Sequence, residues 1–173
     1  MADARRWRCM TAIAWSWCWP EINSGLSVSR SVASVFDQYR QGLWRAERGG
    51  QLFVDLSNPN GLVMTLATPP HPNDRAGRTW LELDRERCQR EIESANARGL
   101  RLVGYWHTHP QTIPAISPTD ITSFSRFARR YSDELPHPIA VIVGLSQEPN
   151  GIKAWSFRKG ACLEATVSNL NQT

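Results

Sequence analysis

Residues 104–120 read GYWHTHPQTIPAISPTD, a stretch that contains the end of an apolar segment, two histidines and the start of a helix. The apolar run RLVGYW at 101–106 predicts a buried strand that leads directly into His107 and His109. Successive side chains of a strand point to opposite faces, so two histidines separated by one residue project to the same side. Ser117 and Asp120 follow in the first turn of a predicted helix.

His107, His109 and Asp120 are therefore expected to bind one metal ion. A side chain in the first helical turn leans toward the helix N-terminus, so Asp120 points back at the histidines. Two histidines and an aspartate leave the fourth tetrahedral position to water, as in a catalytic zinc site. Ser-Pro-Thr-Asp is also a helix-capping signature, and alone it is more often a cap. With both histidines at fixed offsets the chance frequency falls to about one in several thousand, and the cap would itself aim Asp120.

The rest of the chain alternates between strand-like and helix-like patterns. Helices are predicted from the apolar spacing after Ser29, from Asp84 to Gly99, and from Ser117 onward. The segment PPHPNDRAGR at 69–78 is expected to be an irregular loop. Strands are predicted at 25–29, 51–56, 62–68, 79–83, 101–106, 138–145 and 152–158. The pattern indicates an α/β fold with a mixed or largely antiparallel sheet and about three helices.

The chain length of 173 residues suits one domain with one core. We expect that domain to span residues 23–173. Residues 1–22 are rich in tryptophan and cysteine and are interpreted as an N-terminal extension, either an added strand or a poorly ordered segment. A start site placed upstream of the true one would also explain this segment.

Composition restricts the classes of function. The net charge of +4 comes from dispersed arginines without the clusters that track phosphates, which argues against nucleic acid as a partner. No apolar run approaches the ~20 residues that cross a bilayer, so no membrane partner is expected. Four cysteines form no C-x-x-C pair, which favours reduced thiols in a cytoplasmic protein.

At this point the sequence resembles the JAB/MPN family of zinc metalloproteases, whose JAMM motif is a glutamate followed by H-x-H-x(7)-S-x-x-D. The resemblance runs from about Ser27 to Phe157. It implies one catalytic zinc ion per chain on the His-His-Asp set and a catalytic role for Ser117, which would donate a hydrogen bond to the oxyanion. The fold that it implies is a JAB/MPN-like, cytidine-deaminase-like domain with a mixed sheet flanked by about three helices.

The resemblance also assigns a catalytic glutamate. In the family this residue precedes a glycine pair and a strand, a pattern that AERGGQLF matches at Glu47. Glu47 would accept a proton from water and pass it to the leaving amine. From spacing alone, Glu82, Glu86 or Glu91 could also serve as the base.

Active members of this family cleave isopeptide or peptide bonds after the C-terminal tail of ubiquitin or a ubiquitin-like protein. The compact domain is most similar to prokaryotic JAB proteases, including those of antiphage CBASS modules that conjugate a nucleotidyltransferase to target proteins. The implied substrates are conjugates of a ubiquitin-like protein or a nucleotidyltransferase. Their tail is expected to bind as an added strand, between walls at Trp106, Pro110 and Pro114 and under a cover formed by the segment 69–78.

Three other classes of protein were considered. A DNA-associated protein of the RadC type shares the H-x-H and S-x-x-D geometry, but it predicts a basic stripe or a helix-hairpin-helix region that this sequence lacks. A non-proteolytic MPN interaction module would be expected to lack metal ligands, whereas none is missing here. A zinc nucleobase deaminase needs H-x-E and P-C-x-x-C, which are absent.

Overall fold

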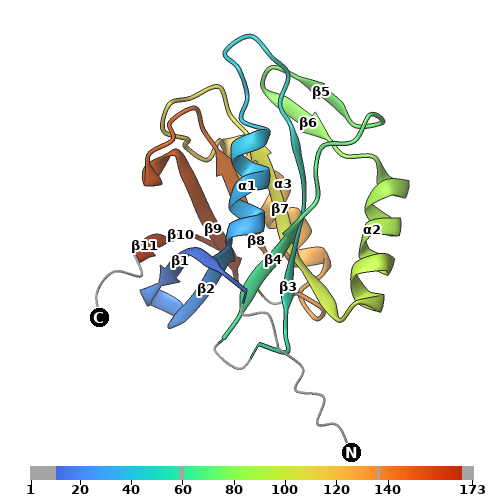
Figure 1. Ribbon diagram of the computed structural model, residues 1–173, viewed down its shortest axis with the longest axis vertical. Coiled ribbons are helices and arrows are strands. Elements are labelled where there is room, and N and C mark those ends of the chain that lie inside the picture. Colours follow the sequence, from blue (N-terminus) through green and yellow to red (C-terminus); the bar gives the residue numbers. More distant parts are fainter. Residues whose placement is uncertain (1–10, 59–60, 136, 169–173) are drawn as a thin grey trace, which may run out of the picture.

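The computed structural model describes residues 11–58, 61–135 and 137–168. Within these residues the chain forms one nine-stranded mixed sheet, three α-helices and a separate two-stranded hairpin (Figure 1). The helices are α1 (Arg30–Gln38), α2 (Arg85–Ala97) and α3 (Pro118–Arg130), and short 3-10 turns cover Pro20–Ile22 and Pro149–Gly151. The α/β class, the mixed sheet and the three helices expected from the sequence are confirmed.

The strand order in the large sheet is β10-β9-β8-β7-β3-β4-β2-β1-β11. Strands β7 and β8 are parallel, as are β2 and β4, and the other neighbours are antiparallel. The strands are β1 (Ile13–Trp19), β2 (Ser24–Ser29), β3 (Gly49–Asp55), β4 (Val63–Ala67), β7 (Leu100–Thr108), β8 (Ile139–Val143), β9 (Ile152–Arg158), β10 (Ala161–Glu164) and β11 (Thr166–Ser168).

Helices cover both faces of this sheet, which explains why its central strands are almost continuously apolar. Along β8, Val141 and Val143 pack in the same cluster as α1, whereas Ala140 and Ile142 pack with Phe124 of α3. Helix α2 covers β3 and β7 beside α3 (Figure 1). The same alternation along β7 directs Trp106 to the α1 side of the sheet and its neighbours Tyr105 and His107 to the α3 side.

The helix starts follow the predicted capping residues. Ser29 and Asp84 accept hydrogen bonds from backbone N–H groups in the first turns of α1 and α2. Helix α2 ends just before Gly99, whose φ of 79° is the left-handed conformation that glycine adopts readily. Ser117 caps α3 in the reciprocal capping box expected from S-x-x-D.

The prediction that the whole segment 69–78 is irregular was wrong. Strand β5 (Arg75–Gly77) pairs with β6 (Trp80–Glu82) in a separate two-stranded sheet. Arg75 and Glu82 form an ion pair across it, and Gly77 lacks the Cβ that would lie 2.1 Å from the indole nitrogen of Trp80. Contacts between β5 and β6 therefore stabilise this hairpin, and the composition of the segment 69–78 alone does not predict them.

The described part of the N-terminal segment forms a strand. Strand β1 lies between β2 and β11, and Trp17 and Trp19 are each only 1% exposed in the main core. The Trp19 indole donates a hydrogen bond to the carbonyl of Leu163, 3.0 Å away. Residues 1–10, including Cys9, lie outside the described residues; Cys18, Cys88 and Cys162 are free thiols. Among the described helices, none is long and apolar enough to span a membrane.

A buried arginine joins α2 to the segment after β4. Arg87 is 2% exposed and forms ion pairs with Asp74 and Glu91 at 3.0 and 2.7 Å. It also donates hydrogen bonds to the carbonyls of Pro69 and Gly49. The side chain thus connects β3, the segment 69–78 and α2, and it supports the hairpin that lies beside the candidate site.

We expect Arg87→Met to lower the free energy of unfolding by about 3–5 kcal/mol, because it leaves Asp74 as an unpaired buried carboxylate. Chemical denaturation would measure the loss. The matched control is Arg90→Met on the same helix, whose exposed pair with Glu86 spans 3.6 Å and is worth no more than about 1 kcal/mol. Equal losses in the two variants would contradict this assignment.

Candidate metal centre

The sheet register positions the two histidines. His107 lies in β7 opposite Gly49 of β3 and beside Ile142 of β8. The extended backbone continues to His109, whose N–H donates to the carbonyl of Val143 at 3.0 Å. Thr108 points to the other face, where its hydroxyl bonds Gln41 and the Arg48 backbone. Both histidines are more than nine-tenths buried and project to the α3 side, as the H-x-H spacing predicts.

The cap of α3 positions Asp120. The Ser117 hydroxyl accepts a hydrogen bond from the Asp120 N–H, and the Ser117 N–H donates to Asp120 Oδ2 at 3.0 Å. The same hydroxyl donates a hydrogen bond to Asp120 Oδ2, with 2.5 Å between the two oxygen atoms. Oδ2 is therefore held by the cap, whereas Oδ1 faces His107 Nε2 at 3.2 Å. The capping interpretation and the metal-ligand interpretation of S-x-x-D coexist in one geometry.

The three side chains converge at distances that fit one tetrahedral cation. The two histidine Nε2 atoms are 3.0 Å apart, and Asp120 oxygens lie 3.2 and 3.4 Å from them. Ligands at 2.0–2.1 Å from a tetrahedral ion are separated by about 3.3–3.4 Å. Two nitrogen lone pairs and a carboxylate meet here, and within the described residues this is the one group of three with that geometry. The residues present therefore fit a divalent metal of the zinc type.

The electrostatics of the cluster also suit a cation. Burial opposes ionisation of Asp120, but hydrogen bonds from His107, His109 and Ser117 hold the pKa of this carboxyl well below its ordinary value. Burial likewise opposes protonation of His109, and the neighbouring Asp120 and Glu47 outweigh it and raise its pKa. The carboxylate is thus ionised at neutral pH, and its negative charge favours a cation in the cluster.

Glu47 lies beside this cluster. It precedes β3, and its N–H donates to the carbonyl of Gly77 in the hairpin at 2.8 Å. Its carboxylate is 6% exposed, with Oε1 4.0 Å from His109 Nε2. This separation is longer than those among His107, His109 and Asp120, so Glu47 lies next to the cluster and outside it. Burial raises the pKa of Glu47 to about 7, with the proximity of His109 opposing the shift and Asp120 adding to it.

The other candidate bases are paired elsewhere. Glu82 forms the exposed ion pair with Arg75, Glu86 pairs with Arg90, and Glu91 pairs with the buried Arg87. None of the three lines the cleft next to the histidines. Of the four glutamates considered from spacing, the structure places Glu47 at the cluster.

The glycine pair after Glu47 permits this approach. A Cβ on Gly49 would lie 2.3 Å from the carbonyl oxygen of Trp106, and one on Gly50 would lie 2.1 Å from the Thr68 oxygen. No side chain fits at either position without moving a backbone. Gly49 thus lets β3 lie close to β7, and Gly50 lets it lie close to the residue that follows β4. This close packing places Glu47 beside His109.

A cleft of about 540 Å³ opens beside Glu47 and the metal cluster. One wall is the hairpin and the chain after it, with Trp80 and Leu81, and the other is α3, with Phe124 and Phe127. Trp80 is 53% exposed, so the cleft presents an apolar surface to solvent. Its remaining lining residues include Tyr105, Ser117 and Thr119.

The cleft walls differ from those expected from the sequence. Pro110 and Pro114 do not line the cleft. Trp106 does line it, but its indole is 1% exposed, packs against Phe36 and donates to the Thr68 carbonyl. The reason is the strand period, which turns the Trp106 side chain to the face opposite His107.

Gln111 is a site residue that sequence reasoning missed. Its Oε1 lies 3.3 Å from His109 Nδ1 and accepts the Ala115 N–H at 2.9 Å. Its own carbonyl accepts the N–H of Leu145, so the backbone is fixed by the segment after β8. A metal ion bound at His109 Nε2 would leave the proton on Nδ1, which would then donate a hydrogen bond to Gln111 Oε1. The sequence signal is only a polar residue two positions after a ligand.

The sequence matches the family of prokaryotic homologs of the JAB domain over residues 3–158. That match covers most of the chain, and together with the mixed sheet and the His-His-Asp cluster it shows that this chain belongs to the prokaryotic JAB family.

Two particular proteins illustrate the similarity. The chain is 27% identical over 132 residues to a protein of Pseudomonas aeruginosa (strain BWHPSA011 / Pa011) named CD-NTase/cGAS isopeptidase, covering 75% of this chain and 83% of that protein. The solution structure of protein DSY2949 from Desulfitobacterium hafniense superimposes with a TM-score of 0.57 at 18% identity, covering 80% of this chain and 88% of the other. At that identity the second similarity shows the fold alone.

Proposed function

We propose that this protein is a zinc-dependent isopeptidase or peptidase that cuts after the C-terminal tail of a ubiquitin-like protein or a conjugated nucleotidyltransferase. The observation that carries the proposal is the cluster of His107, His109 and Asp120, with ligand atoms 3.0–3.4 Å apart and the buried carboxylate of Glu47 beside it. The similarity to a protein named CD-NTase/cGAS isopeptidase supports the substrate class. The reaction would reverse conjugation or process a precursor in a cytoplasmic antiviral defence module.

Bound zinc supplies Lewis acidity, which polarises the scissile carbonyl and lowers the pKa of water to about 7. Glu47 takes one proton from the attacking water and later gives it to the leaving amine, so the products are a free tail carboxylate and a free amine. In the metal-free site, burial raises the pKa of the Glu47 carboxyl to about 7. A nearby cation favours its ionised, proton-accepting form.

Ser117 has one hydroxyl proton, and in this structure Asp120 accepts it. The hydrogen bonds between Ser117 and Asp120 support a role for Ser117 in positioning Asp120 beside the two histidines. Donation to the oxyanion, the role implied by family resemblance, requires this hydroxyl to rotate away from Asp120. The hydroxyl lines the cleft, so a substrate oxygen in the cleft can reach it after rotation.

The cleft favours an extended substrate tail. Trp80 and Leu81 of β6 line it together with Thr79 just before this strand, and β6 pairs only with β5 within the described residues. A tail can therefore add as a third strand to this hairpin and direct its last peptide bond toward the metal cluster. The aromatic side chains Trp80, Phe124 and Phe127 that line the cleft favour small residues next to the cut, and strand addition excludes folded segments whose backbone is already paired.

The test uses a fusion of a ubiquitin-like protein or nucleotidyltransferase, through its own C-terminal tail, to an acceptor protein. We expect zinc-loaded protein to release an acceptor with a new N-terminus or a free lysine amine, identified by mass spectrometry. DNA binding measured across salt concentrations distinguishes the RadC-type alternative, which predicts steeply salt-dependent affinity. An intact fusion together with tight, salt-sensitive DNA binding would refute the proposal.

Gln111 provides a separate prediction. Gln111→Leu is expected to weaken zinc affinity about 10–100-fold, because His109 loses the acceptor that fixes its tautomer and ring orientation. Chelator competition would measure the affinity, and nitrogen-15 NMR would show the loss of the Nδ1-protonated form of His109. Gln111→Glu keeps an acceptor at the same reach and should retain near-normal affinity. Unchanged zinc affinity and an unchanged His109 tautomer in the leucine variant would show that Gln111 plays no such role.

A further inference from the structure

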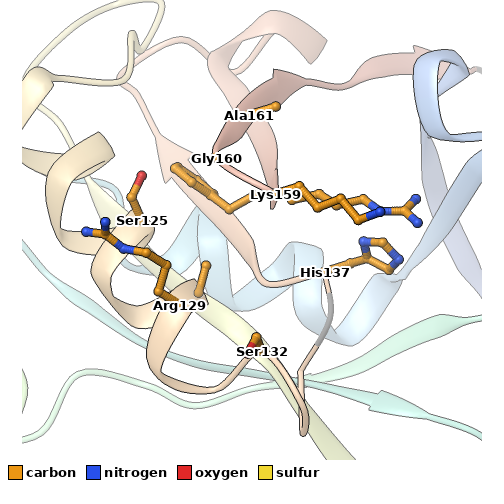
Figure 2. Close-up of a pocket in the computed structure, with 10 residues that line it drawn as sticks. Ser125, Arg129, Ser132, His137, Lys159, Gly160 and Ala161 are labelled. Carbon is orange, nitrogen blue, oxygen red and sulfur yellow. The ribbon is translucent and has the colours of Figure 1, made fainter.

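A second pocket lies on the other side of α3 from the cleft. It has a volume of about 540 Å³ and is formed by α3 and the turn between β9 and β10 (Figure 2). We call it the α3–hairpin pocket, where the hairpin is that of β9 and β10 and not the β5–β6 hairpin beside the metal cluster. It shares no lining residue with the cleft beside the metal cluster, so it has no assigned role in the proposed hydrolysis.

The pocket is positively charged. Arg129 of α3 and Arg158 and Lys159 of the β9–β10 segment line it, and no aspartate or glutamate does. None of these three cations forms an ion pair within the described residues. Figure 2 shows Arg129 on the helix side and Lys159 on the hairpin side of the pocket. Positive charge without a paired carboxylate among the described residues therefore lies on two sides of the α3–hairpin pocket.

The backbone fixes the hairpin side of this pocket. Lys159 and Gly160 have φ angles of 47° and 83°, the left-handed conformation at both central positions of a two-residue hairpin turn. On the helix side, Ser125 and Arg129 are four residues apart and lie on one face of α3, and Ser132 follows in the turn after the helix. The cations and hydroxyls are thus presented by regular elements whose geometry the fold determines.

The interior of the pocket is apolar. Ala128 and the buried ring of Phe157 line it between the charged groups. His137 completes the wall; its Nδ1 is buried without a hydrogen-bond partner among the described residues. Burial and the neighbouring Arg158 lower the pKa of His137, so the imidazole is neutral and adds hydrogen-bonding capacity without charge.

We propose that the α3–hairpin pocket binds a small molecule that carries a phosphate group together with a flat apolar part. The cations on either side of the pocket, Arg129 on one and Arg158 and Lys159 on the other, can pair with phosphate oxygens, and the serine hydroxyls supply further donors. The volume lies within the range of small-molecule sites, which combine an apolar lining with a few polar groups. An acidic protein segment is the alternative ligand. Such a segment needs positive charge at the surface, but it does not need a pocket of about 540 Å³ lined by the ring of Phe157.

The experiment titrates the full-length protein with AMP, inorganic phosphate, adenosine and a short acidic peptide, using calorimetry and NMR. We expect saturable binding of AMP, with phosphate and adenosine each binding at least tenfold more weakly. Arg129→Ala and Lys159→Asn should each weaken AMP binding at least tenfold; asparagine tolerates the positive φ at that turn. The chemical shifts of His137 should move on AMP addition, whereas those of His107 and His109 should not.

The matched control is Arg126→Ala, which removes the same charge from an exposed position of α3 outside the pocket. It should change AMP affinity less than twofold. Absence of saturable AMP binding, tighter binding of the acidic peptide, or an equal loss in the control would each overturn the proposal. Zinc content and fusion cleavage are measured separately, so failure here is distinguishable from failure of the proposed hydrolase.

Discussion

Glu47→Gln should retain the fold and the bound zinc but lose isopeptide cleavage by about 10²–10⁴-fold, the usual contribution of general acid–base catalysis. Glutamine has the same size and can accept the same contacts, but it cannot take a proton from water. The carboxylate stands 4.0 Å from the nearest ligand nitrogen and outside the ligand set, so its charge adds little to metal affinity. Single-turnover cleavage of the fusion, with metal analysis of the same preparation, measures both quantities.

The matched variant for this prediction is Glu82→Gln. Glu82 lies on the hairpin next to the cleft, is exposed and pairs with Arg75, so its loss should leave the cleavage rate within about twofold of wild type. If the Glu47 variant retained near-normal turnover while the Glu82 variant lost it, the general base would be Glu82 and the assignment to Glu47 would be wrong.

Zinc stoichiometry is the second large effect. The purified protein is expected to hold one zinc ion per chain, and His107→Ala or His109→Ala should each abolish stoichiometric binding, since two protein ligands do not complete a tetrahedral site. Inductively coupled plasma mass spectrometry after dialysis measures the content. Lowering the pH should release the metal, because protonation of the histidines competes with coordination.

Asp120 needs a more conservative change because it also closes the capping box of α3. Asp120→Asn removes the charge but keeps an oxygen that can accept the Ser117 N–H, so it separates metal loss from the cost of a lost cap, about 1 kcal/mol. His71→Ala serves as the control, since His71 lies in the segment 69–78 and bonds only its own turn among the described residues. Full zinc content in all three ligand variants would refute the metal centre.

Several features of the site were predictable because they are local. The period of two along a strand places His107 and His109 on one face, and both lie there in the structure. The capping box places Asp120 at the start of α3, and the observed bonds to Ser117 are those that S-x-x-D predicts. The helix positions and the hairpin of β3 and β4 also follow from apolar spacing and from turn residues within a few positions.

Other features depended on groups far apart in the chain. Glu47 reaches the cluster because β3 pairs with β7 in the register that sets Gly49 opposite His107, and the backbone of Arg48 bonds Thr108 across 60 residues. The spacing of glutamates carries no information about that register, which is why Glu82, Glu86 and Glu91 remained open. The role of Gln111 likewise depends on its backbone contact with Leu145.

The sequence by itself determined that His107 and His109 share one strand face, that a capped helix carries Asp120, and that the fold is of the α/β class, because strand period, helix capping and apolar spacing act over a few residues. Only the tertiary structure decided which glutamate lies beside the His-His-Asp cluster, that β6 and the residues flanking it form one wall of the cleft, and that Trp106 turns into the core. Each of these depends on burial and pairing between distant segments, whose free energy exists only once the sheet is assembled.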